Sequence, residues 1–302
     1  MSLLNPAAAL TPQELVSFDS ESVRVDEARR HFERALELNR SQDREGSLWD
    51  KAGTLNNLAN LDRMENRLDE AREHDEAALA LYRPLAQRNP DVYLPYLAVT
   101  LNNLGAVNRL QNHLDAAAKD YEESLQLNRE LVSKNPSKYL PNIALILNEY
   151  GLADASQNHL DAARQHYDEA LAISRHLAAE SPDVYLPQLA ATLTNYALFN
   201  VYERHMDEAG QRFEEAVNID RHLAEQNSSV YLPNLAMSLS NLARVEHIQG
   251  RDHSADEHYR EAYNLLESLV QRNPAYASDM GRVEASLKEL QKTAGSQPPG
   301  RK

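Results

Sequence analysis

Cysteine is absent from the 302 residues of the chain. Disulfide bonds, thiol catalysis and cysteine-based metal sites are therefore excluded. No apolar run reaches the ~18–20 residues that a membrane-spanning helix needs. The first ten residues lack a basic segment followed by a long apolar one, so we expect no signal peptide and a cytoplasmic location.

Glycine and basic residues are also scarce. Nine glycines fit a mostly helical chain, and 31 Lys and Arg residues against 46 Asp and Glu residues give a net charge of −15. This charge disfavours nucleic acid and anionic membranes as partners. It is compatible with a basic partner, but we favour the interpretation of a solvated acidic surface.

What the chain does contain is a 46-residue period. The tripeptide Tyr-Leu-Pro recurs at this step and begins at Tyr93, Tyr139, Tyr185 and Tyr231. An Asn or Ser four residues earlier recurs in the same register at Asn89, Asn135, Ser181, Asn227 and Asn273. Self-similarity of this length is typical of a solenoid, in which each repeat packs on its neighbours. We therefore expect an all-α solenoid.

The period divides the chain into repeats and end segments. Five full repeats are expected at 47–92, 93–138, 139–184, 185–230 and 231–276. A degenerate leading repeat is expected at 11–46 and a C-terminal capping helix at 277–294, with Val283 and Leu290 on its apolar stripe. The flanking residues 1–10 and 295–302 are expected to be a flexible N-terminus and a disordered tail.

Each repeat is predicted to fold as two antiparallel helices, A and B. In the second repeat, Pro95 suits the first turn of helix A, and helix B should stop before Asn135-Pro136 because the residue before proline resists the α conformation. A left-handed residue is expected to close helix A at Asn66, Asn112, Asn158, Arg204 and Gly250. An acidic residue suited to a helix N-terminus opens helix B at Asp69, Asp115, Asp161 and Asp207.

Helix B carries a repeated small-aromatic-small pattern. In the second, third and fourth repeats it reads Ala117, Tyr121, Ser124; Ala163, Tyr167, Ala170; and Ala209, Phe213, Ala216. Small residues let helices approach, and we interpret the aromatic ring as filling the space between repeats. Asp75 interrupts the aromatic column.

The pattern Leu104, Gly105, Ala117, Tyr121 and Leu125, with its repeats, resembles the tetratricopeptide repeat, over about residues 25–276. The Thr-Leu-Asn-Asn-Leu segment of helix A is most similar to the extended repeats of kinesin light chains and of many bacterial multi-repeat proteins. The resemblance implies a right-handed superhelix with helix A lining a concave groove that binds an extended peptide. Each unit is 12 residues longer than the usual 34.

A polar column stands where the resemblance implies a buried aromatic. Its members are Asp62, Asn108, Asp154, Asn200 and Glu246. Either helix A is rotated, or these groups bond to the tyrosine column; we favour the second because buried polar groups need partners.

Two rows of amides mark the side of helix A that faces away from helix B. One row includes Asn56, Asn102 and Asn148, and the other includes Asn57, Asn103, Asn195 and Asn241, with Glu149 interrupting it. An amide both donates and accepts, as a peptide backbone requires. The alternative is that these amides cap turns or bond neighbouring helices A.

Further groove candidates are Asn60, Arg63, Arg109, Leu198, Tyr202 and Arg244. Arg63 and Arg109 could pair with a ligand carboxylate or form ordinary surface ion pairs. The apolar run formed by Leu152, Leu198, Phe199 and Tyr202 could receive an apolar side chain of a peptide or belong to the core.

We expect no enzyme activity, cofactor or metal. His113, His159 and His205 recur one per repeat, too far apart to share one zinc ion, and no phosphate-binding, dinucleotide or zinc-protease motif occurs.

The leading hypothesis is an adaptor that binds an extended segment of a protein in the groove of helices A. One alternative is a regulator whose curvature changes when a ligand binds. The other is weak homo-oligomerisation through the end repeats, near Trp49 or residues 277–302.

Overall fold

The computed structural model describes residues 18–38 and 45–296. The expected flexible N-terminus, 1–10, lies outside the described residues. The tail expected to be disordered from Gly295 begins within a helix that ends at Ser296, and its remainder also lies outside them.

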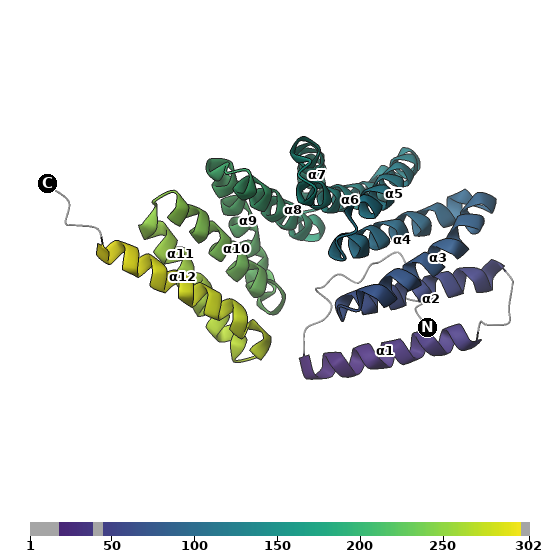
Figure 1. Cartoon of the computed structure of the whole chain (residues 1–302), viewed down its shortest axis with the longest axis horizontal. Helices are drawn as coiled ribbons and strands as arrows, with labels where there is room; N and C mark the ends of the chain where they lie inside the picture. The colour runs from purple at the N-terminus through teal and green to yellow at the C-terminus, as the bar shows by residue number, and fades with distance from the viewer. Residues whose placement is uncertain (1–17, 39–44, 297–302) are drawn as a thin grey trace. The chain divides into compact units, whose positions relative to one another are not determined.

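Helices are the regular elements of the described residues (Figure 1). They are α1 (Phe18–Leu38), α2 (Glu45–Met64), α3 (Leu68–Arg88), α4 (Pro90–Leu110), α5 (Leu114–Lys134), α6 (Pro136–Ser156), α7 (Leu160–Glu180), α8 (Pro182–Tyr202), α9 (Met206–Gln226), α10 (Ser228–Ile248), α11 (Asp252–Val270), the 3-10 helix η2 (Pro274–Tyr276) and α12 (Ala277–Ser296). The chain divides into two compact units, 1–173 and 174–302, with the boundary inside α7.

Within each unit, a helix packs chiefly on the helices before and after it in the chain. Helices α2, α4 and α6 of the first unit and α8 and α10 of the second are the predicted helices A. Helices α3, α5, α7, α9 and α11 are the predicted helices B. The expected all-α solenoid of tetratricopeptide-like helix pairs is confirmed.

The turns that join helix A to helix B have one common geometry. Each holds one residue with a positive φ, and the angles are 58° at Asn66, 62° at Asn112, 62° at Asn158, 63° at Arg204 and 74° at Gly250. Asn and Gly tolerate this left-handed conformation, so the prediction from the sequence is confirmed. Arg204 is the member of this column whose residue type does not readily adopt the left-handed conformation.

The connection from helix B to the next helix A is a single residue. Helix α5 ends at Lys134, Asn135 breaks it, and α6 starts at Pro136. The predicted start of helix A at Pro95 is therefore wrong, because α4 begins at Pro90 and Pro95 lies inside it. Pro95 is tolerated because its missing N–H removes only a bond to a carbonyl of the first turn.

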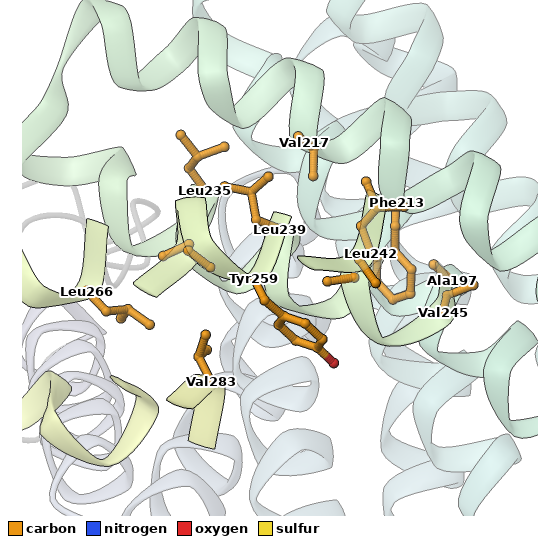
Figure 2. Close-up of a cluster of buried hydrophobic side chains, with 14 of the residues drawn as sticks. Ala197, Phe213, Val217, Leu235, Leu239, Leu242, Val245, Tyr259, Leu266 and Val283 are labelled. Atoms are coloured by element: carbon orange, nitrogen blue, oxygen red, sulfur yellow. The ribbon is translucent and has the colours of Figure 1, made fainter. Parts of the chain in front are cut away.

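Small residues and aromatic rings build the core. Tyr121 and Tyr167 are fully buried, and a Cβ atom added at Gly105 would lie 2.8 Å from the Tyr121 ring. In the second unit, Phe213 and Tyr259 lie in one apolar cluster with Leu239 and Val245 (Figure 2). The interpretation of these columns as core is confirmed.

The polar column is buried, but its predicted bond to the tyrosines is wrong. Each member has a partner on helix B of the same repeat, 12 residues later or, for Asn200, at Glu208. Asp62 also accepts from Arg29 of α1. The oxygens of Asp62, Asp154 and Glu246 lie 2.7 Å from Nδ1 of His74, His166 and His258, and Asn108 Nδ2 donates to Asp120 at 2.7 Å. These bonds satisfy most of the buried groups, whereas Oδ1 of Asn200 is buried without a hydrogen-bond partner among the described residues.

Ion pairs link consecutive helices B on the exposed side. They recur at the 46-residue step, joining Arg83 to Glu123, Arg129 to Glu169, Arg175 to Glu215, and Arg221 to Glu261. A single exposed pair stabilises little. Because the ion pair recurs, these four arginines of helices B each lie beside a carboxylate of the same chain.

The end helices cover the apolar faces of the terminal repeats. Leu36 of α1 packs against the apolar cluster of the first unit, and Arg29 donates to Asp62 at 2.7 Å. Trp49 of α2 packs edge-on against Tyr96 of α4 with ring centres 6.0 Å apart. At the other end, Val283 and Leu290 of α12 are buried in the cluster of the second unit.

The Arg204 turn gives a stability prediction. Replacing Arg204 by Asn, the residue of three equivalent turns, should raise the free energy of unfolding by about 0.5–1 kcal/mol, because it relieves the left-handed strain of a long side chain. Denaturant titration measures the change. The matched control is Asn158→Ala in the preceding turn, which should lower stability by a similar amount, and an unchanged midpoint for Arg204→Asn would contradict the prediction.

Asp75 gives a second prediction. Its carboxylate is 1% exposed, and neither oxygen has a hydrogen-bond partner among the described residues. Because the fourth repeat combines Ala197 with Phe213 where the first has Ala59 and Asp75, Asp75→Phe should fit. It should raise the free energy of unfolding by about 2 kcal/mol or more by removing an unsatisfied buried group and burying a ring.

The pH dependence of stability tests the same site. Burial raises the pKa of Asp75 well above its usual value; nearby Arg63 opposes this effect, whereas Asp120 and Asp62 add to it. The unfolded carboxyl loses its proton near pH ~4 while the folded one keeps it, so this group lowers stability as the pH rises from ~4 toward the folded pKa. Asp75→Asn should remove that slope, and an identical pH profile for Asp75→Asn and wild type would refute the assignment.

Candidate protein-interaction face

One side of each helix A is not covered by helix B. It carries positions spaced by four, three and four residues, which lie on one side of a helix. We call this side the A-face. In the first unit it comprises Gly53, Asn57, Asn60, Met64; Val99, Asn103, Ala106, Leu110; and Leu145, Glu149, Leu152, Ser156. In the second unit it comprises Ala191, Asn195, Leu198, Tyr202; and Met237, Asn241, Arg244, Ile248.

The outer amide row predicted from the sequence lies on the A-face. Asn57, Asn195 and Asn241 are half-buried there. Asn103 occupies the same column but is only 4% exposed, and its Nδ2 donates to Oδ1 of Asn56 at 3.2 Å. For this pair, the structure has the bond between neighbouring helices A that the sequence left open as an alternative.

The inner amide row points away from solvent. Asn56 and Asn148 are buried, and Asn102 is half-buried. Oδ1 of Asn102 and Oδ1 of Asn148 are buried without a hydrogen-bond partner among the described residues. These side chains contribute to the packing between helices and are less accessible to a partner than the outer row.

The arginines of the predicted site differ in their surroundings. Arg109 forms an ion pair of 2.9 Å with Glu149 of α6. Arg63 donates to Oδ1 of Asn60 at 3.3 Å, and Arg244 donates to Oδ1 of Asn241 at 3.4 Å. Arg109 therefore forms an ion pair within the protein, which is one of the two alternatives that the sequence left open.

The apolar run splits between core and surface. Phe199 is buried, Leu198 packs partly on the core of the second unit, and Tyr202 is 60% exposed. The exposed apolar residues Met64, Leu110, Leu145, Met237 and Ile248 also lie on the A-face, and the site predicted from the sequence does not include them. The column at the 46-residue step reads Met64, Leu110, Ser156, Tyr202 and Ile248. The recurrence of large apolar residues at four of its five positions is the sequence signal that could have identified them.

The histidines of the turns follow the last A-face position of their repeats by three residues. His113, His159 and His205 are exposed beside the starts of α5, α7 and α9. Within residues 18–38 and 45–296, no three His, Asp or Glu side chains cluster in a way that could hold a metal ion. No helix in these ranges is long and apolar enough to cross a bilayer.

Two segments match family models of the tetratricopeptide repeat, residues 50–130 and residues 235–276. The match agrees with the helix pairs, the small-aromatic contacts and the resemblance noted in the sequence. These two segments therefore contain tetratricopeptide repeats. Both models describe a repeat and neither describes a catalytic domain. Repeats of this family generally mediate protein–protein interactions.

Solved structures share the fold at low sequence identity. BtubC (BKLC) from P. vanneervenii is 19% identical with a TM-score of 0.59, and the match covers 97% of this chain and 96% of that one. A putative kinesin light chain with TPR-like repeats from Podosopora anserina is 16% identical with a TM-score of 0.55, over 77% and 99% of the two chains. The apo form of RapI is 14% identical with a TM-score of 0.51, over 85% and 88%. No curated protein sequence matches the chain significantly.

Proposed function

We propose that the protein is a non-enzymatic adaptor that binds an extended segment of a partner protein along the A-face. The observation that carries the proposal is an outward amide that recurs at one position of helix A, at Asn57 in the first unit and at Asn195 and Asn241 in the second. Side-chain amides can pair with the N–H and C=O groups of an extended backbone without reading its sequence.

The charge of the A-face supports this proposal. Its charged residues are Glu149 and Arg244, and Glu149 is paired with Arg109. The remaining positions are apolar, small or uncharged polar, in a chain whose net charge is −15. A nearly neutral surface with amides and exposed apolar side chains suits a protein segment better than a nucleic acid, because binding of nucleic acid depends on cations that neutralise phosphates.

Three amides define the test. The triple variant Asn57→Ala, Asn195→Ala and Asn241→Ala should lose about tenfold to a hundredfold in affinity for segments selected on wild type from a displayed library of disordered peptides, because each backbone bond contributes about 1 kcal/mol. Asn103 is left in place because its bond to Asn56 is structural. Fluorescence anisotropy measures the affinities.

The matched control is Asn218→Ala, which removes an exposed amide from helix B. It should bind as wild type does. Equal affinities for the triple variant and wild type, with unchanged thermal midpoints, would reject the A-face as the binding surface. Failure of wild type to enrich any peptide would reject binding of extended segments altogether.

A further inference from the structure

The A-face of the second unit exposes large apolar side chains on both of its helices. Tyr202 of α8 is 60% exposed, and Met237 and Ile248 of α10 are 55% and 53% exposed. A single exposed apolar residue needs no explanation. Here the three share one face of consecutive repeats, which is typical of an interaction surface.

These side chains form rows around the amides. Ala191 and Met237 occupy equivalent positions nearest the helix N-termini, and the amides Asn195 and Asn241 follow one turn later. Tyr202 and Ile248 occupy the last position of the face. The first and last rows are 11 residues apart, about 16 Å along a helix. A segment held at the amides would thus have apolar surface on both sides.

Arg244 is the charged residue of this A-face. The equivalent residues of the other repeats are Asn60, Ala106, Leu152 and Leu198, none of which is charged. Arg244 is exposed, and its guanidinium donates to Oδ1 of Asn241 at 3.4 Å. Among the described residues, no carboxylate lies within ion-pair distance of it. His247, three residues later on α10, is half-buried, and its Nδ1 lies 2.8 Å from an oxygen of Asp252. A guanidinium placed in this way can bind a carboxylate of a partner with two parallel hydrogen bonds.

We propose that the A-face of the second unit selects a partner segment that combines large apolar side chains with a carboxylate. The proposal rests on the proposed function, because the amides Asn195 and Asn241 would hold the backbone of the same segment. The rows at Met237 and at Tyr202 and Ile248 receive the apolar side chains. Arg244 binds the Asp or Glu of the partner.

Charge reversal tests the assignment of Arg244. The probe is a displayed library of random 16-residue peptides, selected in parallel on full-length wild type and on Arg244→Glu. We expect wild type to enrich Asp or Glu beside Leu, Ile, Phe or Tyr. We expect Arg244→Glu to enrich Lys or Arg at that place and to bind the wild-type peptides about tenfold or more weakly.

Arg260→Glu is the matched control, because it makes the same change of net charge on helix B of the same unit, where Arg260 pairs with Asp256. It should select the wild-type motif. The double variant Tyr202→Ser and Ile248→Ser should lose the preference for large apolar residues while keeping the preference for an acid.

The outcomes separate this inference from the proposed function. If the triple amide variant loses binding but the selected peptides show no acidic or apolar preference, the proposed function stands and the inference is wrong. The same motif on wild type and Arg244→Glu also refutes the inference. An absence of enrichment on wild type refutes both.

Discussion

The contact between an aromatic ring of helix B and a small residue of helix A is the constraint on which the rest of the repeat depends. At Gly105 there is no room for a Cβ atom, because the Tyr121 ring lies 2.8 Å from where it would stand. Gly151 and Tyr167 repeat the contact with a closest approach of 3.0 Å. This close approach commits one side of helix A to helix B. Residues on the other side of the same helix then face outward, and they form the A-face.

Hydrogen bonds within the repeat determine where charge remains available. Buried acids of helix A, such as Asp154, are satisfied by a histidine of helix B, and helix B arginines such as Arg129 pair with the next helix B. Most of the negative charge therefore lies on helices B, and the A-face is left nearly neutral. A partner that binds there is recognised by backbone bonds and apolar contacts, with Arg244 as the local exception.

The fold could be predicted from the sequence because it rests on repeated local chemistry. The left-handed turn at Asn112, the break at Asn135-Pro136 and the ring at Tyr121 each follow from the properties of single residues. The start of helix A is misplaced because the preference of proline for the first helical position fits Pro90 as well as Pro95, and the sequence pattern does not choose between them. The partners of the polar column were misassigned because its bonds join two helices, and the direction of a side chain across a helix pair depends on rotations that spacing alone does not give.

The candidate site is less predictable from the sequence than the fold is. The physical reason is that its residues are not constrained by packing, and this lack of constraint also indicates where the site lies. Packing requires a small residue in some core columns and an aromatic ring in others, so the residues of each core column vary little. The column of Ala117, Ala163 and Ala209 is one example. The A-face columns have no such requirement, and the last one reads Met64, Leu110, Ser156, Tyr202 and Ile248. Asp75 and Arg204 depart from their columns where packing and backbone geometry oppose the change. Arg244 departs where nothing in the fold opposes it. Where the fold does not constrain a residue, that residue can differ between repeats and can serve to recognise a partner. In the described repeats, the A-face is the surface with such differences.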